Sequence, residues 1–294
     1  MNDYLLSALL GVVEGLTEFL PISSTAHLRI TEALFRVPMD DEYWKMYTVV
    51  IQLGAILCLP VYFRSRIAGF LALRPREGRS WLGHPLALVM IAFVVTAAPS
   101  FLLHKVIGKH LESLTVMGVA ILVGGAVMWV VDAARAPWEK AGPQAPGSPI
   151  RTWAMEDMTL LQSAWIGACQ ILSAVFPGTS RSMSTIVAGQ LARMSRASAL
   201  EFSFFLSIPT MFAATAYDLF KTLAGRDASA LGRPSIDLHG WVVLSIGFVV
   251  SFAVAYVSVA WLMSWVRRHG FVAFGVYRIV LGIAVLAAGH RLAG

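Results

Sequence analysis

The sequence predicts an all-α integral membrane protein with an inverted-topology repeat, made of six transmembrane helices and two re-entrant helical hairpins. Three observations support this prediction. The 294 residues are 57% hydrophobic and 14% charged, whereas a soluble domain is about 45 to 50% apolar and about 25% charged. Several apolar segments approach the roughly 20 residues that a spanning helix needs. Two other apolar regions are interrupted by similar polar stretches.

Six segments are apolar and long enough to be spanning helices. The chain starts with Asn2 and Asp3 rather than with a basic stretch, so we expect no cleaved signal peptide and expect the apolar segments themselves to insert. The predicted spans are residues 46–63, 85–103, 114–131, 202–220, 241–266 and 271–289.

Two further apolar regions, residues 4–37 and 159–200, are broken in the middle by proline and small polar residues. "LPISST" breaks the first region and "FPGTSRS" breaks the second. Non-helical backbone inside a membrane is tolerated only where it is buried in protein or lines a wet cavity. We therefore expect two re-entrant hairpins whose tips meet at a polar site.

The two broken regions correspond to each other at a shift of 156 residues. The correspondence predicts one membrane domain (1–294) formed by two copies, 1–133 and 158–294, joined by a cytoplasmic linker, 134–157. Because each copy carries three spans, an odd number, the second copy is inverted in the membrane. The shift places Gly11 on Gly167, Glu14 on Gln170, Pro21 on Pro177, Ser23 on Thr179, Ser24 on Ser180, and residues 46–63 on 202–219.

Basic residues predict the orientation in the membrane, because Lys and Arg gather in cytoplasmic loops. The Pro- and Gly-rich stretch 134–151 is expected to be flexible and to lie on the same side. The net charge of +6 is explained by loops that face anionic lipid, so we expect no nucleic-acid partner. The arginines that indicate the cytoplasmic side are Arg64, Arg66, Arg74, Arg76, Arg79, Arg267 and Arg268.

Cysteine usage excludes two classes of site. Cys58 and Cys169 lie singly inside apolar segments, without a CxxC spacing. We therefore expect neither a disulfide nor a zinc site, and we interpret both residues as core residues.

Glu14 and Glu18 are four residues apart, so on a helix they share one face. Two carboxylates inside a membrane are costly and repel each other, and a divalent metal or an arginine would relieve both costs. The alternative is that both glutamates lie near the surface at a helix end.

After Pro21 the chain is expected to restart as a helix. Ser23, Ser24 and Thr25 fall in its first turn, where hydroxyls cap free amides and where amides and helix dipole favour phosphate. Ser24 and His27 are three residues apart, which is the spacing of a nucleophile and its base on one helix face. Capping is the structural alternative for at least one of these hydroxyls.

The second break offers a cation and further hydroxyls. Arg181 carries a planar fork of donors that suits phosphate oxygens, although it could instead balance Glu14 or Glu18. Gly178 allows a close backbone approach. The remaining residues that we predict to bind the phosphates are Thr179, Ser180, Ser182 and Thr185.

Three more polar residues lie in apolar segments. Gln52 and Glu201 are candidates for lining the cavity. Arg278 is expected to snorkel or to pair with a lone carboxylate. None of the three is a predicted catalyst.

At these residues the sequence closely resembles the bacterial undecaprenyl pyrophosphate phosphatases of the bacitracin-resistance type. The resemblance covers nearly the whole chain and is most specific in "GVVEGLTEFLPISSTAHL" and "PGTSRSMST", with support from "VVIQLGAI", "EDMT" and "EFSFFLSIP". In that family the first motif carries acidic, serine and histidine residues needed for activity, and the second carries a required arginine. These roles fall on Glu14, Glu18, Ser24, His27 and Arg181.

The resemblance implies hydrolysis of a C55 polyprenyl diphosphate to the carrier monophosphate, with Mg²⁺ or Ca²⁺ bound by Glu14 and Glu18. It implies a multi-pass protein of the bacterial inner membrane whose site opens toward the periplasmic face, and a role in cell-wall synthesis and bacitracin resistance. A homodimer is compatible with it. Two positions depart from the family pattern, since Ala26 and Met183 replace glycines.

Alternative mechanisms and alternative functions remain compatible with the sequence. Ser24 could attack the terminal phosphorus with His27 as base or acid, or a metal-activated water could attack directly. A transporter or flippase for an anionic lipid headgroup is a rival function, because inverted repeats and broken helices are typical of transporters. An intramembrane serine protease built on Ser24 and His27 would leave the glutamates and Arg181 without a role.

Overall fold

The computed structural model describes residues 2–37, 42–73, 81–107, 113–223 and 237–293, and its regular elements in these ranges are all helices. Five of these helices are long and apolar enough to cross a membrane. Large apolar side chains such as Leu102, Val130 and Val257 lie exposed on their surfaces, as expected where lipid replaces water. The prediction of an all-α integral membrane protein is therefore confirmed.

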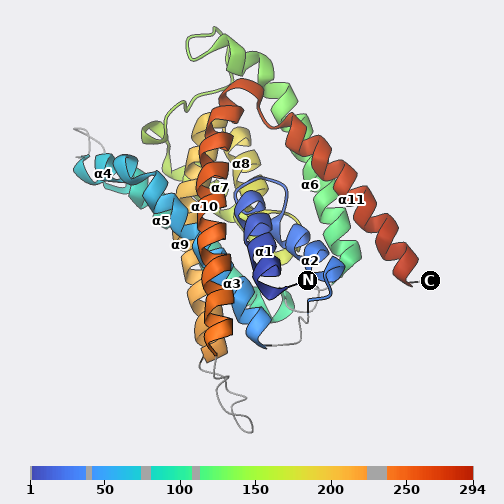
Figure 1. The fold of residues 1–294 in the computed structure, drawn as a ribbon. Coiled ribbons are helices and arrows are strands. Elements are labelled where there is room, and N and C mark those ends of the chain that lie inside the picture. Colours follow the sequence, from blue (N-terminus) through green and yellow to red (C-terminus); the bar gives the residue numbers. More distant parts are fainter. Residues whose placement is uncertain (1, 38–41, 74–80, 108–112, 224–236, 294) are drawn as a thin grey trace. The chain divides into compact units, whose positions relative to one another are not determined.

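The chain divides into two compact units, each assembled from discontinuous segments. Unit 1 contains Met1–Phe19, Ser24–Arg64 and Ser207–Ala260. Its helices, blue and orange in Figure 1, are α1 (Asp3–Thr17), α2 (Ser24–Leu34), α3 (Glu42–Tyr62), the second part of α9 (Arg196–Leu223) and most of α10 (Leu238–His269).

The core of unit 1 joins α1, α3 and α10. Tyr47 on α3 is fully buried, and its hydroxyl donates to the carbonyl of Ser7 over 2.8 Å. Leu10, Ile51 and Val243 belong to the same buried cluster. Apolar packing around one satisfied hydroxyl therefore holds the first helix against two helices that are distant in the sequence.

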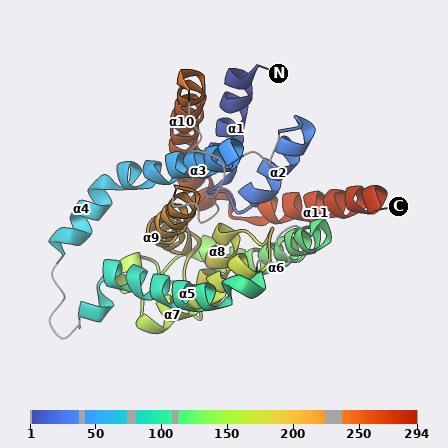
Figure 2. The same cartoon turned by 90° about the horizontal axis from the view of Figure 1, so that it is seen from below.

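Unit 2 contains Leu20–Ser23, Ser65–Leu206 and Trp261–Gly294. Figure 2 shows α5 lying along α7, and α6 beside α11. Its elements are α4 (Arg64–Ala72), the short helix η1 (Trp81–Gly83), α5 (Pro85–Ile107), α6 (Leu114–Ala141), the short helix η2 (Met155–Asp157), α7 (Leu160–Val175), α8 (Arg181–Leu191), the first part of α9, the end of α10, and α11 (Val272–Ala293).

Glycines allow α6 and α11 to approach closely. A Cβ added to Gly275 would lie 2.9 Å from the carbonyl oxygen of Gly125, and one added to Gly282 would lie 2.9 Å from that of Gly118. Small residues at such spacings let membrane helices pack backbone to backbone, where apolar burial alone gives no driving force. This crossing brings the middle of α11 to the interior of unit 2.

Both predicted helix breaks are confirmed. The first apolar region stops at Thr17 and restarts at Ser24, and the second stops at Val175 and restarts at Arg181. Each break contains a proline, which has no N–H to continue a helix. We call residues 18–23 the first break and residues 176–180 the second break. The placement of the two hairpins as re-entrant elements stays a prediction.

All six predicted spans coincide with helices, namely α3, α5, α6, α9, α10 and α11. The apolar part of α11 within the described residues, Val272–Ala288, is shorter than the other five. The number of six spans therefore stays a prediction. Prolines lie inside α3, α5, α6 and α9, which membrane helices tolerate where neighbours satisfy the freed carbonyls.

The segment predicted as a flexible linker is more structured than expected. α6 continues to Ala141, so the first part of the predicted linker is helical. Near its other end, the Arg151 N–H donates to the Arg193 carbonyl over 2.8 Å, and Thr152 forms a β-bridge with Met194. Pro137 does not end the helix, and Gly142 with positive φ does.

Two serine contacts occur at related positions of the chain. In unit 1, Ser7 Oγ donates to the Val243 carbonyl over 2.7 Å. In unit 2, Ser163 Oγ donates to the Leu88 carbonyl over 2.5 Å. The serines are 156 residues apart in the sequence and the acceptors 155.

Two close glycine contacts show the same offset of 156 residues, each one helical turn after the serine of its helix. A Cβ on Gly11 would lie 2.8 Å from the Gly247 carbonyl oxygen, and one on Gly167 would lie 2.5 Å from that of Ala92. The matching contacts support the predicted duplication. The repeat boundaries 1–133 and 158–294 stay a prediction.

A buried ion pair ties four elements of unit 2 together. Arg196 donates to both carboxylate oxygens of Asp132 over 2.7 and 2.8 Å, and the Phe271 N–H donates to the same carboxylate over 2.8 Å. Gln190 adds a longer bond of 3.3 Å. Gly270 has φ +72°, and a Cβ there would lie 2.4 Å from the Arg196 guanidinium carbon.

We expect Asp132→Leu to destabilise the protein by about 3 to 5 kcal/mol, because it leaves the Arg196 charge buried without its partner. Thermal unfolding in detergent measures the effect. The control is the double variant Asp132→Leu with Arg196→Met, which removes both charges and should regain most of the loss. A single variant as stable as the wild type, or a double variant no better than the single one, would contradict this assignment.

Candidate active site

The two predicted carboxylates lie at the end of α1, where the first break begins. Glu14 is fully buried on α1, and Glu18 follows the last residue of that helix. The Glu18 N–H still donates to the Glu14 carbonyl over 2.9 Å, so the helical turn continues through Glu18. Both carboxylates therefore lie on one side of the helix end, as their spacing predicted.

The Ser24 hydroxyl donates a hydrogen bond to Oε2 of Glu18. Ser23, immediately before it, has φ +77°, so the chain turns sharply at this point and α2 begins with Ser24. Through this turn, the first hydroxyl of the new helix faces the carboxylate at the end of the preceding one. Sequence spacing had suggested His27, a half-buried residue one turn along α2, as the partner of Ser24.

The second break is a tight turn made by Gly178 and Ser180. Gly178 has φ +88°, and a Cβ there would lie 2.7 Å from the Met117 carbonyl oxygen. The close backbone approach predicted for Gly178 is thus made to α6. Ser180 has φ +68° and its side chain caps α8 by accepting from the Met183 N–H over 3.4 Å. The Ser180 side chain thus caps α8, and its predicted contact with phosphate stays a prediction.

Arg181 is the first residue of α8 and is partly exposed. The next hydroxyls face the protein interior. Ser182 and Thr185 are buried, and Thr185 Oγ1 lies 2.6 Å from Ser203 Oγ on α9. Thr185 is thus engaged with a neighbouring helix, and its predicted role in phosphate binding stays a prediction.

Arg278 has a position that the sequence did not predict. It is fully buried on α11, and its guanidinium donates to backbone carbonyls of both breaks. The expectation that Arg278 snorkels or pairs with a lone carboxylate is wrong, because the α6–α11 glycine contacts bring it into the interior and its described partners are carbonyls. A charged residue in the middle of an apolar helix was the only available signal.

Glu201 has a partner that the sequence did not predict. It pairs with Arg66 over 2.6 Å, and Glu156 pairs with the same guanidinium over 2.6 Å. The role of Gln52 and Glu201 in lining the cavity stays a prediction. Hydrogen bonds that the Arg66 guanidinium donates to Glu201 and Glu156 raise its pKa above its ordinary value, against the opposing effect of burial. Arg74, Arg76 and Arg79, which we also used to predict orientation, lie outside the described residues.

An apolar groove of about 690 Å³ lies between α6, α7 and α8 in unit 2. Most of its lining is aliphatic or aromatic, including Val123, Trp165 and Leu172. Thr179 of the second break lines it as well, and so does Met183, one of the two departures from the family pattern. The groove therefore joins an apolar surface to the predicted phosphate loop.

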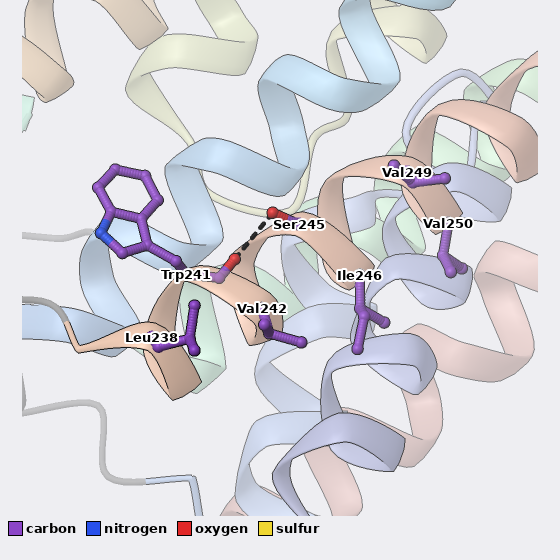
Figure 3. Close-up of a pocket in the computed structure, with 7 residues that line it drawn as sticks. All are labelled: Leu238, Trp241, Val242, Ser245, Ile246, Val249 and Val250. Carbon is purple, nitrogen blue, oxygen red and sulfur yellow. Dashed lines mark hydrogen bonds between the residues drawn. The ribbon is translucent and has the colours of Figure 1, made fainter.

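A second hollow lies on α10 in unit 1 (Figure 3). Its one hydroxyl, Ser245, donates to the Trp241 carbonyl of the same helix over 2.8 Å. The other labelled side chains are Leu238, Val242, Ile246, Val249 and Val250. This surface offers apolar contact and no group for chemistry.

Glu14 and Glu18 are the candidate ligands for a metal ion. Within the described ranges no group of three or more His, Cys, Asp or Glu side chains is placed to hold a metal ion. Glu14 and Glu18 still offer two carboxylates on one side of a helix end. Oxygen donors of this kind suit Mg²⁺, which commonly binds one or two carboxylates and takes its remaining ligands from water and phosphate. The pair fits such an ion.

The structure brings some predicted site residues together and leaves others in separate groups. Glu18 and Ser24 are bonded within unit 1, which also contains Glu14, Thr25 and His27. Ser23 belongs to unit 2, as do the second break, Arg181, Ser182 and Thr185. The convergence of both groups in one pocket stays a prediction.

Comparison with known proteins identifies the family. The profile of the family described as "Bacitracin resistance protein BacA" matches residues 7–284. A protein named undecaprenyl-diphosphatase from Koribacter versatilis is 61% identical over 293 residues, which cover 98% of each chain. Proteins of the same name from Rhizobium johnstonii and Thermus thermophilus are each 39% identical, covering 97% and 93% of this chain and 96% and 92% of theirs. The chain therefore belongs to the BacA family.

Proposed function

We propose that the protein hydrolyses undecaprenyl diphosphate to undecaprenyl phosphate and inorganic phosphate. Its family and the names of its relatives support this activity. The structural observation that carries the proposal is the Ser24 hydroxyl bonded to Glu18 at the start of a broken helix. A hydroxyl held by a carboxylate is an activated nucleophile. No feature of the family match favours a transporter.

In the proposed reaction, Ser24 Oγ attacks the terminal phosphorus of the diphosphate. The bond from this phosphorus to the bridging oxygen breaks, and undecaprenyl phosphate leaves. Glu18 accepts the proton of the Ser24 hydroxyl, and His27 supplies a proton to the leaving oxygen. Water then releases phosphate from the serine. Direct attack by water on the same phosphorus is the alternative mechanism. The Ser24→Ala variant below distinguishes it from attack by Ser24.

Arg181 and the amides at the start of α8 are proposed to hold the phosphate oxygens. Phosphoryl transfer depends mainly on such positioning and on charge stabilisation. A Mg²⁺ or Ca²⁺ ion on Glu14 and Glu18 would neutralise charge on the phosphates. The other residues proposed to contact the phosphates are Ser23, Thr25, Gly178, Thr179, Ser180, Ser182 and Thr185.

We propose further that the protein lies in the bacterial inner membrane, with the site open toward the outer face. The described arginines Arg64, Arg267 and Arg268 support this orientation by marking a cytoplasmic side. A homodimer and a role in recycling the carrier lipid of cell-wall synthesis belong to the same proposal.

The first test of this function is phosphate release in detergent, where no gradient exists. We expect turnover of undecaprenyl diphosphate that is lost with chelator and restored by Mg²⁺ or Ca²⁺. Arg181→Ala should lower kcat/KM by about 10²-fold, the loss of one or two charge-assisted hydrogen bonds. The control is Arg267→Ala, an exposed arginine at the end of α10. Absence of phosphate release by the wild type would contradict the function and favour a transporter.

We expect Ser24→Ala and Glu18→Gln each to lower kcat by at least about 10³-fold, because one removes the nucleophile and the other its charged acceptor. A phosphoserine adduct trapped from wild-type protein by acid quench should be absent from Ser24→Ala. Glu32→Gln is the control, since Glu32 is a buried carboxylate on α2 that bonds to Thr48. Retained turnover in Ser24→Ala would exclude the nucleophile and leave attack by water.

The groove between α6, α7 and α8 predicts where part of the isoprenoid chain binds, because it is apolar and Thr179 of the second break lines it. We expect Val123→Trp, which fills the groove, to raise KM for undecaprenyl diphosphate severalfold and to affect farnesyl diphosphate much less. Val130→Trp is the control, at an exposed position of α6 outside the groove. Equal effects on both chain lengths would contradict this placement.

A further inference from the structure

Arg278 is a large, fully buried side chain of unit 2 whose hydrogen bonds reach both helix breaks. The guanidinium donates to the Pro21 carbonyl over 3.3 Å, and to the Gly178 and Thr179 carbonyls over 3.1 and 3.0 Å. A fourth bond of 3.3 Å reaches the Ala120 carbonyl on α6. All of these residues belong to unit 2.

The carbonyls of Pro21, Gly178 and Thr179 need donors, because each break interrupts a helical hydrogen-bond ladder inside apolar surroundings. An unsatisfied buried carbonyl costs about 1 to 3 kcal/mol. Pro21 and Pro177 have no N–H to donate, and backbone in apolar surroundings has little water to bond instead. One guanidinium with five donors in a fixed fork meets several carbonyls at once.

The cation is also uncompensated within the described part of the chain. Its described hydrogen-bond partners are neutral carbonyls, and its Nε has no hydrogen-bond partner. Arg196, the other buried arginine of this unit, contrasts with it by pairing with Asp132. A buried positive charge beneath Gly178 and Thr179 favours an anion at the amides that follow.

We propose that Arg278 is a positioning residue for the phosphate site. It ties Pro21 of the first break to Gly178 and Thr179 of the second break, all within unit 2, and so fixes the backbone that precedes Ser23 and the amides after Thr179. Its positive charge, next to the Gly178 and Thr179 carbonyls, favours binding of the diphosphate at the second break. The inference rests on the proposed function, because it assigns Arg278 to the same site.

Arg278→Met and Arg278→Lys test the two parts of the proposal. The methionine variant should lower kcat by about 10²-fold, as expected for a displacement of about 1 Å between reacting groups. It should also raise the inhibition constant of inorganic pyrophosphate by about tenfold through the lost charge. The lysine variant keeps the charge without the fork, so it should recover the pyrophosphate affinity and only part of kcat.

The inhibition constant separates positioning from simple loss of protein, because it does not depend on the active fraction. A fall in kcat with an unchanged pyrophosphate constant would contradict the proposal, and so would wild-type values of both. Wild-type protein assayed in parallel distinguishes failure of the proposed function from failure of the role proposed for Arg278. If it releases no phosphate, the proposed function fails, whereas normal turnover with unaffected Arg278 variants overturns this inference alone.

Two glycines on α6 test the proposal with Arg278 retained, in case Arg278→Met does not fold. A Cβ on Gly124 would lie 2.6 Å from Arg278 Nη2 and from Met183 Cε, whereas one on Gly118 would lie 2.7 Å from Leu286 Cγ. Both substitutions are to be compared in a Met183→Ala background, which removes the second contact of a Gly124 methyl. In that background Gly124→Ala should displace the guanidinium, and Gly118→Ala should not.

Relative to Met183→Ala alone, Gly124→Ala should lower kcat by about tenfold or more, as a small displacement of the reacting groups would. Gly118→Ala should leave kcat nearly unchanged, since its methyl would meet the apolar side chains of Leu286 at 2.7 Å and Val285 at 3.3 Å, which can shift without moving the guanidinium. Equal kcat values for the two glycine variants would overturn the proposal.

Discussion

The structure depends on the hydrogen bonding of backbone that leaves the helix inside an apolar chain. At each break, carbonyl groups lose their helical donors, and inside a membrane they have little water to replace them. In unit 2 the guanidinium of Arg278 meets this need for Pro21, Gly178 and Thr179 together. The need to satisfy these carbonyls therefore also brings the two breaks to one side chain.

The same breaks create the groups that a phosphate site requires. A helix that restarts presents free amides and the positive end of its dipole. At the second break Ser180 uses its hydroxyl to cap one amide, and Arg181 follows directly. At the first break the Ser24 hydroxyl is directed to Glu18 instead. The second break thus has the features of an anion-binding loop, and the first break holds a hydroxyl next to a carboxylate that can accept its proton. Both breaks have similar sequences.

The fold could largely be predicted from the sequence because its signals are local. Apolar length located the spanning helices, and Pro21 and Pro177 located the breaks, since a proline acts on its own turn of helix. The partners of Ser24, Glu201 and Arg278 could not be predicted. Arg278 lies about a hundred residues from Gly178 and further from Pro21, and no periodicity relates such positions. The extension of α6 to Ala141 was missed because Pro and Gly content suggested a coil.

Two groups of residues are proposed to act on one diphosphate. Ser24 and Glu18 form the first group, and Arg181 with the loop before it forms the second. An experimental structure with a methylene-bridged, non-hydrolysable lipid diphosphate tests this claim most directly. The account predicts the terminal phosphorus in line with Ser24 Oγ, with Arg181 bonded to its oxygens. A diphosphate bound by Arg181 on a surface that Ser24 and Glu18 do not share would contradict it.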